Sequence, residues 1–331
     1  MFIIAEIGNM HNGDVDLAKE FVSAAAQAGV DAVKFQTHIF DAESLPDAPA
    51  PSYFSLESRK QYFERTAFSK EQWIDIKEYC ESLGVEFMSS PFSLEAVDLL
   101  DEIGMKRFKI PSGEVTNHPL LEKAAATGRQ VILSSGMSSW TELDAAVKVL
   151  RDNGCEDLCV MQCSSVYPCP PEKVGLNVLF EMKQRYGCAL GLSDHTMGNA
   201  AAVLAAGIGV VMAEKHFVLS SDMHGSDAGH SIDPEGLKNY VLQIREAEKI
   251  LNCLVDKDVA VRELSDMKYI FEKSIVAACD IEAGTVIEEN MLAFKKPGDG
   301  IRADEYKSIL GRKLNVRVNK NTKIQKEMVD R

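Results

Sequence analysis

The sequence of 331 residues lacks the marks of a membrane, secreted or zinc-binding protein. No run reaches the roughly 18 consecutive apolar residues that a membrane span needs. The N-terminus, MFIIAEIGNMHNGD, has no basic residue before its apolar stretch and no small-residue cleavage pattern, so we expect a buried first strand and not an export signal. The eight cysteines contain no CxxC motif, which indicates small core residues and not a zinc cluster or disulfide framework. These absences predict a cytoplasmic protein without a membrane partner.

Basic residues are also scarce relative to acidic ones. The chain has 36 Lys and Arg against 50 Asp and Glu, which gives a formal net charge of −14. Such a charge opposes extended contact with nucleic-acid phosphates, although a few lysines can still hold a small anion. We therefore expect no nucleic-acid partner. The length is suited to one large domain followed by a small one.

Short apolar segments alternate with helix-like segments along the first 250 residues or so. The apolar segments are residues 2–8, 31–38, 85–92, 107–114, 130–136, 158–165, 189–195 and 211–217. Nearly continuous apolar runs are typical of parallel strands that are buried on both faces. Eight such units predict an α/β fold, a (β/α)8 TIM barrel. An open doubly wound sheet is the alternative, but no G-x-G-x-x-G motif follows the first segment.

The pattern changes toward the C-terminus. We expect a barrel catalytic domain over residues 1–252, a charged linker over 253–271 and a small β-rich domain over 272–331. In the last of these, short strand-like runs are broken by EAGT, PGDG and NKNT. Its core is marginal alone, so we expect it to pack on a larger surface. Residues 39–68, with three prolines, are long for a barrel loop and predict a cover over the active site.

Polar residues gather at the C-terminal ends of the predicted strands, where barrel enzymes carry their chemistry. They are Glu6, Lys34, Gln36, Ser89, Ser90, Lys109, Ser112, Glu114, Ser134, Ser135, Ser165, Tyr167, Ser193, Asp194, His195, Glu214, Lys215 and His216. Lys34 and Lys109, together with the serine hydroxyls, predict a phosphate-binding cradle. A single lysine is explained as well by pairing with a neighbouring carboxylate. Two lysines inside barrel strands favour an anionic ligand.

Two histidines end the seventh and eighth predicted strands. His195 and His216 would therefore lie on adjacent strands, where both imidazoles can reach one ion. With a carboxylate such as Glu114 they would suit a divalent metal that keeps open positions for substrate. The residue types alone do not separate such a site from an acid–base pair. An anion cradle beside a metal predicts carbon chemistry on a phosphorylated substrate.

Six motifs occur in the order found in the sialic (nonulosonic) acid synthase family, namely AEIGNMHNG, VKFQTH, KIPSGE, LSSGM, GLSDHT and EKHF. The chain resembles this family over nearly its whole length, and its tail resembles the family's antifreeze-like (SAF) module. The resemblance implies condensation of phosphoenolpyruvate with an N-acylated amino sugar, with phosphate released by C–O cleavage. The product would be a nine-carbon 2-keto-3-deoxy acid. The resemblance also implies a homodimer in which each SAF module covers the neighbouring barrel.

The same resemblance implies roles for single residues. His195 and His216 would bind a divalent metal, typically Mn²⁺ or Mg²⁺, and would be catalytic together with Glu6 and Glu114. Phosphoenolpyruvate would contact Lys34, Ser90, Lys109, Ser112, Ser134 and Ser193. The sugar or its reacting centre would contact Glu6, Gln36, Glu114, Tyr167 and Asp227. Further substrate contacts would come from Ser165, Asp194 and Lys296.

Two positions depart from the family pattern. Lys296 stands where sialic acid synthases carry arginine before the PG of the SAF module, and Ser165 stands where they carry asparagine. A lysine cannot make the bidentate contact of arginine, so we expect the acyl substituents of the sugar to be bound differently. N-acetylmannosamine and a 2,4-diacetamido-trideoxyhexose, the precursor type of legionaminic or pseudaminic acid, both stay open as acceptors.

Two other functions fit parts of the sequence. A Schiff-base aldolase would need a lysine with a depressed pKa in the barrel, for which Lys109 and Lys215 are candidates. The sixth strand, LCVMQCSS, contains no lysine for this role. A non-catalytic carbohydrate-binding protein would explain the tail but not the polar strand ends.

Overall fold

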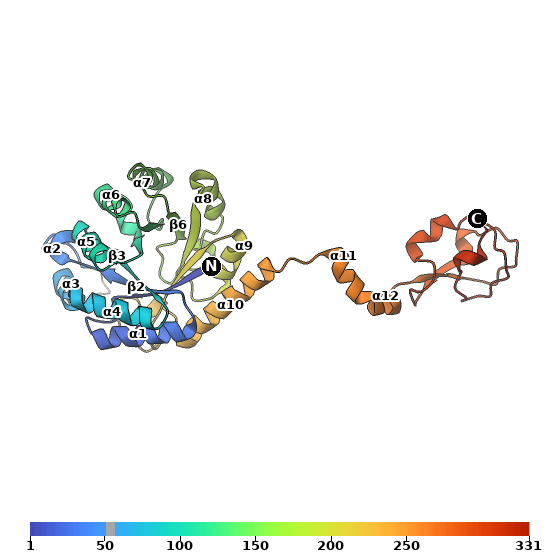
Figure 1. The fold of residues 1–331 in the computed structure, drawn as a ribbon, viewed down its shortest axis with the longest axis horizontal. Coiled ribbons are helices and arrows are strands. Elements are labelled where there is room, and N and C mark those ends of the chain that lie inside the picture. The colour runs from blue at the N-terminus through green and yellow to red at the C-terminus, as the bar shows by residue number, and fades with distance from the viewer. Residues whose placement is uncertain (51–56, 331) are drawn as a thin grey trace. The chain divides into compact units, whose positions relative to one another are not determined.

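The computed structural model describes residues 1–50 and 57–330. They form two compact units, Met1–Asn252 and a second unit that begins at Cys253. Figure 1 shows the helices of the first unit arranged around its strands. Within the described residues, no helix is both long enough and apolar enough to cross a membrane. Part of the predicted cover, residues 51–56, and the last residue, Arg331, lie outside the described residues.

The first unit is built on parallel strands in the order β3-β2-β1-β8-β7-β6-β5-β4. They are β1 (Phe2–Gly8), β2 (Ala32–Thr37), β3 (Glu86–Pro91), β4 (Arg107–Ile110), β5 (Gln130–Ser134), β6 (Leu158–Cys163), β7 (Ala189–Asp194) and β8 (Met212–His216). Strand β3 also packs against β4, so the sheet nearly closes on itself. The predicted (β/α)8 barrel is confirmed. One predicted strand is shorter than expected, because residues Ser112–Glu114 form a 3-10 turn after β4.

Helices cover the outside of these strands and bury their apolar faces against them. They are α1 (Val15–Ala28), α4 (Lys70–Ser82), α5 (Leu94–Glu102), α6 (His118–Ala126), α7 (Trp140–Asp152), α8 (Val178–Tyr186), α9 (Ala200–Ile208) and α10 (Pro234–Asn252). Local sequence sets their ends: in α1 the Asp14 carboxylate accepts hydrogen bonds from the amides of Asp16 and Leu17. Two short helices, α2 (Phe40–Glu43) and α3 (Arg59–Thr66), lie between β2 and α4.

Apolar side chains fill the interior of the barrel below the polar strand ends. This inner cluster contains Ile4, Ala32, Met88, Ile132, Cys159, Met161 and Met212. A larger cluster lies between the strands and the helices and includes Phe21, Phe35 and Phe108. Polar side chains therefore gather at the carboxyl ends of the strands, where a barrel can hold a site.

The second unit has its own core around a small antiparallel pair, β9 (Ser274–Ala277) and β10 (Leu292–Lys295). Ile275, Ile287 and Leu314 are among its buried residues. Isolated bridges, such as Ile281 with Val318, connect its other extended segments. Residues 253–271, expected as a linker, contain α11 (Lys257–Ala260), a 3-10 turn (Val261–Leu264) and α12 (Ser265–Phe271).

Candidate active site

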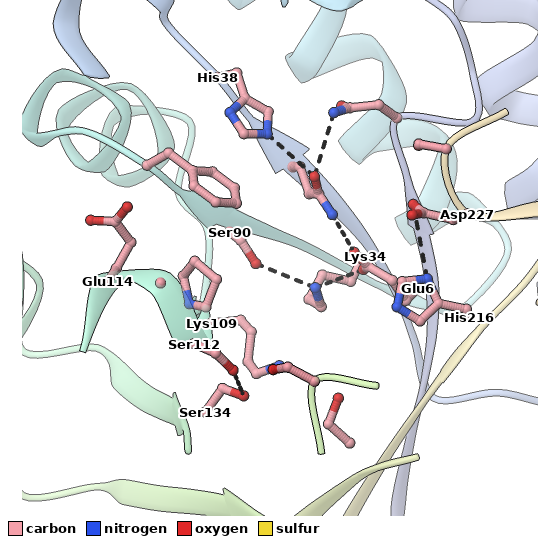
Figure 2. A pocket seen from close by; sticks show the side chains of 18 of the residues that line it. Glu6, Lys34, His38, Ser90, Lys109, Ser112, Glu114, Ser134, His216 and Asp227 are labelled. Carbon is pink, nitrogen blue, oxygen red and sulfur yellow. Dashed lines mark hydrogen bonds and ion pairs between the residues drawn. The ribbon is translucent and has the colours of Figure 1, made fainter. Parts of the chain in front are cut away.

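A cavity of about 830 Å³ opens at the carboxyl ends of the barrel strands. It is lined by most of the residues that the sequence suggested, namely Glu6, Lys34, Gln36, Ser90, Lys109, Ser112, Glu114, Ser134, Ser165, Tyr167, Ser193, His195, His216 and Asp227. Figure 2 shows several of these side chains around the same space. Glu43, Tyr62 and Phe63 of the predicted cover line it as well.

Two of the suggested residues, Asp194 and Lys296, have other contacts in the structure. Asp194 is not among the described residues that line the cavity. Its carboxylate lies 3.1 Å from the ammonium of Lys215, which is fully buried and also donates to the carbonyl of Thr196. Lys296 belongs to the second unit, where its ammonium lies 4.7 Å from the centre of the Phe271 ring. A Schiff base on Lys215 is disfavoured, because this amine is held away from the cavity.

Four buried charges meet in the cavity. The Lys34 ammonium lies 2.7 Å from Glu6 Oε2 and 3.7 Å from Glu214 Oε1. The Lys109 ammonium lies 2.9 Å from Glu214 Oε2 and 3.0 Å from Glu214 Oε1. Each lysine is thus paired with a carboxylate. Such a pairing is the alternative explanation that the sequence left open for a single buried lysine. Two positive and two negative charges balance one another in the cavity.

Burial and these partners shift the ionisation of the four groups. Burial alone would raise the pKa of Glu214, but Lys109 and Lys34 lower that pKa to about 2. Burial raises the pKa of Glu6, and the charge of Glu214 adds to this effect against the opposing effect of Lys34. Burial opposes the charge of Lys34, but Glu214 and Glu6 raise its pKa above the ordinary value. The cluster therefore keeps Glu214 ionised and Lys34 protonated at neutral pH.

Serine hydroxyls surround the two lysines. The Ser112 and Ser134 hydroxyl oxygens lie 2.9 Å apart, and the amide of Gly136 donates to the Ser112 hydroxyl at 3.0 Å. Lys34 donates to the Ser90 hydroxyl at 3.3 Å. The absence of a side chain at Gly136 leaves room for the neighbouring serine hydroxyls. A Cβ at this position would lie only 2.4 Å from the Ser165 hydroxyl oxygen. These donors and the two ammonium groups make a site that suits an anion.

Three histidines, His195, His216 and His230, line the same cavity. His195 Nδ1 donates to the carbonyl of Ser164 at 2.8 Å, which fixes its tautomer. The rings of His195 and His216 are 5.3 Å apart, between centroids. His216, Asp227 and His230 each offer one ligand atom, and these atoms lie within 4.8 Å of one another. In the part of the chain that is described, His216 Nδ1 and His230 Nε2 are buried without a hydrogen-bond partner.

This histidine and carboxylate group fits a divalent metal. Burial, with the neighbouring charges of His195 and His230, lowers the pKa of His216 well below its ordinary value. Burial, with His195, lowers the pKa of His230 to about 4. Both imidazoles are therefore neutral, which is the form that binds a metal. Two imidazole nitrogens that have no hydrogen bond within the described part of the chain and one carboxylate, 3.9 Å and 3.6 Å from them, match the ligand preference of such an ion.

A model of the NeuB family matches residues 21–255 of the chain. This protein belongs to the NeuB family. A SAF domain model matches residues 272–330, so the resemblance predicted from the motifs is confirmed for both parts. The chain is 40% identical to an uncharacterized protein of Methanocaldococcus jannaschii, over 95% of this chain and 90% of that one.

Two further relatives of this NeuB-family protein have informative names. It is 36% identical to the N,N'-diacetyllegionaminic acid synthase of Campylobacter jejuni, over 94% of either chain. Among solved structures, an N-acetylneuraminic acid (sialic acid) synthetase from Leptospira borgpetersenii has 29% identity and a TM-score of 0.68, covering 80% of this chain and 90% of that one.

Sequence reasoning missed several residues of the NeuB-family cavity. His230 lies on a 3-10 turn (Ala228–His230) in the connection that follows β8, and a further histidine after His216 was its only signal. Glu214 was noted at a strand end, but its pairing with both lysines was not foreseen. His38 and Phe92 also line the cavity, and each directly follows a strand.

Proposed function

We propose that this protein is a nonulosonic (sialic-type) acid synthase. It would condense phosphoenolpyruvate with an N-acylated amino sugar and form a nine-carbon 2-keto-3-deoxy acid, releasing phosphate by C–O cleavage. The observation that carries the proposal is the presence, in one cavity, of a lysine and serine anion site and of the histidine and carboxylate group. Membership of the NeuB family and the names of its relatives support the same activity.

The donor would bind on the lysine side of the cavity. Lys34 and Lys109 would balance the charges of phosphoenolpyruvate, and the hydroxyls of Ser90, Ser112 and Ser134 would donate to its oxygens. Ser193 lies beside them, 3.3 Å from Glu214 Oε1, and would contribute a further hydroxyl. Glu214 would keep both ammonium groups in place before the donor arrives.

A divalent ion, Mn²⁺ or Mg²⁺, would be held by His195 and His216, the two ligands expected from the sequence, with Asp227 and His230 as further donors. When bound, such an ion polarises a carbonyl group and stabilises the negative charge that develops on its oxygen. Among the described residues, His216 Nδ1 and His230 Nε2 are buried without a hydrogen bond, which supports this assignment.

The remaining residues would orient the acceptor and handle protons. C3 of phosphoenolpyruvate would attack the open-chain aldehyde, water would add at C2, and the bridging oxygen would leave with phosphate. Glu6 and Glu114, whose pKa values burial raises, are the carboxyl groups proposed for the reacting centre. Gln36 and Tyr167 would contact the sugar, and Ser165 would reach it from the connection that follows β6.

The acceptor would be N-acetylmannosamine or a 2,4-diacetamido-trideoxyhexose. The relative named N,N'-diacetyllegionaminic acid synthase supports the second sugar. Lys296, in place of arginine, supports an acyl group that is bound differently from that of N-acetylmannosamine. The reaction would take place in the cytoplasm, where phosphoenolpyruvate is made.

The proposed assembly is a homodimer with exchanged modules. Residues 1–252 would be the catalytic barrel, 253–271 the linker and 272–331 the SAF module, which would complete the site of the partner.

Phosphate release tests the proposal. The protein would be mixed with phosphoenolpyruvate, Mn²⁺ and a panel of acceptor sugars, and the products identified by mass. With ¹⁸O in the bridging position, the released phosphate should carry the label, because the C–O bond breaks. Unlabelled phosphate would rule out this mechanism, and no phosphate with any N-acylated sugar would rule out the synthase.

A further inference from the structure

His38 is held rigidly at the wall of the cavity. It directly follows β2, and its ring stacks between Phe63 and Phe92, with centroids 3.8 Å and 4.0 Å away. Nδ1 lies 2.9 Å and 3.0 Å from the two carboxylate oxygens of Glu43. Nε2 lies 3.2 Å from Oε1 of Gln36. The His38 and Glu43 side chains are only 7% and 6% exposed, so water cannot replace these contacts.

Both partners of the His38 ring are hydrogen-bond acceptors. The Gln36 amide nitrogen donates to Glu6 Oε1 at 3.0 Å, so the Gln36 oxygen is the atom that faces His38. Asn9 also donates to this oxygen, at 3.4 Å. Because the Gln36 oxygen can only accept a hydrogen bond, Nε2 of His38 carries a hydrogen in this contact.

We propose that His38 is a positioning residue that fixes the side-chain amide of Gln36 and thereby directs its N–H groups at the Glu6 carboxylate. Hydrogen bonds lead from His38 to the Gln36 amide and on to Glu6, and Figure 2 labels the two ends of this path, His38 and Glu6. The inference rests on the proposed function, which puts Glu6 at the reacting centre. Glu43 supports the arrangement because its carboxylate contacts Nδ1 on the far side of the ring.

Loss of the Nε2 hydrogen has a definite consequence. The Gln36 oxygen then keeps only the longer contact with Asn9, at 3.4 Å. If the amide turns over, its oxygen meets Glu6 Oε1, which repels it. Glu6 would leave its present orientation beside Lys34. The contacts of Lys34 with Ser90 and of Lys109 with Glu214 do not involve Gln36. Turnover should therefore fall while the affinity for phosphoenolpyruvate is kept.

A matched pair of variants separates this role from packing. In Glu43→Gln the carboxylate is lost, but a neutral His38 can still donate from Nε2 while the new amide donates to Nδ1. In the double variant His38→Phe, Glu43→Gln, the aromatic stack with Phe63 and Phe92 is kept, and the donor is lost without leaving an unpaired buried carboxylate. His38→Gln restores an N–H donor without the aromatic ring.

We expect kcat of Glu43→Gln to match that of the wild type and kcat of the double variant to fall about 10- to 100-fold. His38→Gln should regain part of the loss. The Kd of phosphoenolpyruvate, measured by calorimetry, should change less than about twofold in all three. Equal kcat in Glu43→Gln and the double variant would overturn the inference. A loss of donor affinity in parallel with kcat would also overturn it, because it would point to packing alone.

A spectroscopic measurement decides the inference without turnover. In protein labelled with ¹⁵N-glutamine, the side-chain signals of Gln36 are identified by their absence in Gln36→Glu. They should keep their position in Glu43→Gln and move in the double variant, and also in His38→Leu if the double variant does not fold. Unmoved signals would overturn the inference. If the wild type releases no phosphate, the proposed function fails, while the Gln36 signals still decide the role of His38.

Discussion

Lys109 on β4 and Glu214 on β8 meet inside the barrel, with the ammonium 2.9 Å from the nearer carboxylate oxygen. Lys34, on β2, lies 3.7 Å from the other oxygen of the same carboxylate. One buried acid thus connects the two cations that we assign to the donor phosphate. The anion site is assembled before the ligand binds, and Glu214, together with Glu6 beside Lys34, balances the charge of two neighbouring buried lysines.

Glu214→Gln should therefore destabilise the protein and make it depend on an anion. Removing one partner of a buried ion pair typically lowers the free energy of unfolding by about 3 kcal/mol. Inorganic phosphate or phosphoenolpyruvate should raise the melting temperature of the variant more than that of the wild type, because the anion replaces the missing charge. Glu102→Gln removes an acid from the exposed pair with Lys70 and should have little effect. Equal stability of Glu214→Gln and wild type would contradict the assignment.

The effect of Glu214 should depend on pH in a defined direction. Its pKa is about 2 in the folded protein, below the ordinary 4.5, so folding favours the ionised form. The stability that the carboxylate contributes is fully present above pH 4.5 and is lost as the pH falls toward 2. The difference in unfolding free energy between wild type and Glu214→Gln should therefore shrink from pH 6 to about pH 3. Denaturant unfolding at several pH values measures it, and a constant difference would argue against this ionisation.

Metal removal should abolish turnover, and Mn²⁺ or a similar ion should restore it. His216→Ala and His230→Ala should fold but lose most of kcat and bind the ion more weakly, because each deletes a proposed ligand. His224→Ala is the matched control, since this exposed histidine lies in the same connection after β8. Metal content and phosphate release are measured on the same samples. Full activity of the metal-free protein would refute the metal assignment.

Substitution of Gly8 by alanine tests whether metal binding and turnover depend on the position of the Asp227 carboxylate. Gly8 has a φ of +57°, and a Cβ at this residue would lie 2.6 Å from Asp227 Oδ2. Gly84 has a φ of +74° and no atom within 4 Å of an added Cβ. Alanine at either position should destabilise the fold by about 1 kcal/mol through backbone strain. Only Gly8→Ala should also weaken metal binding and turnover, and equal activity of the two variants would contradict this.

The sequence predicted the barrel because the alternation of apolar segments and helices is local information. It also predicted which strand ends carry polar groups. The sequence did not show which of the polar residues at one strand end face the cavity. Side chains alternate along a strand, so Glu214 and His216 point into the barrel, whereas Lys215 between them points outward to Asp194. His230 and His38 lie outside the strands, so strand register cannot place them. Their positions depend on packing between segments that are distant in sequence.

If SAF modules are exchanged between subunits, as we propose, two inactive variants should complement each other. Glu6→Gln should inactivate the barrel that carries it. Lys296→Ala, in the KKPGDG stretch of the module, should inactivate the barrel that the module covers. Each variant is purified and shown to be nearly inactive, and the two are then unfolded and refolded together in equal amounts. A mixture of the two folded proteins that has not been refolded is the control.

Random pairing should make half of the dimers mixed. If modules are exchanged, one site of each mixed dimer combines both defects, and the other combines an intact barrel with an intact module. Roughly a quarter of the wild-type sites should therefore return. If each module serves its own barrel, every site keeps one defect and no activity appears. The exchange is refuted if activity stays absent in a sample whose mixed dimers are verified by native mass spectrometry. Recovery near one quarter would make Lys296 a residue that acts on sugar bound to the partner.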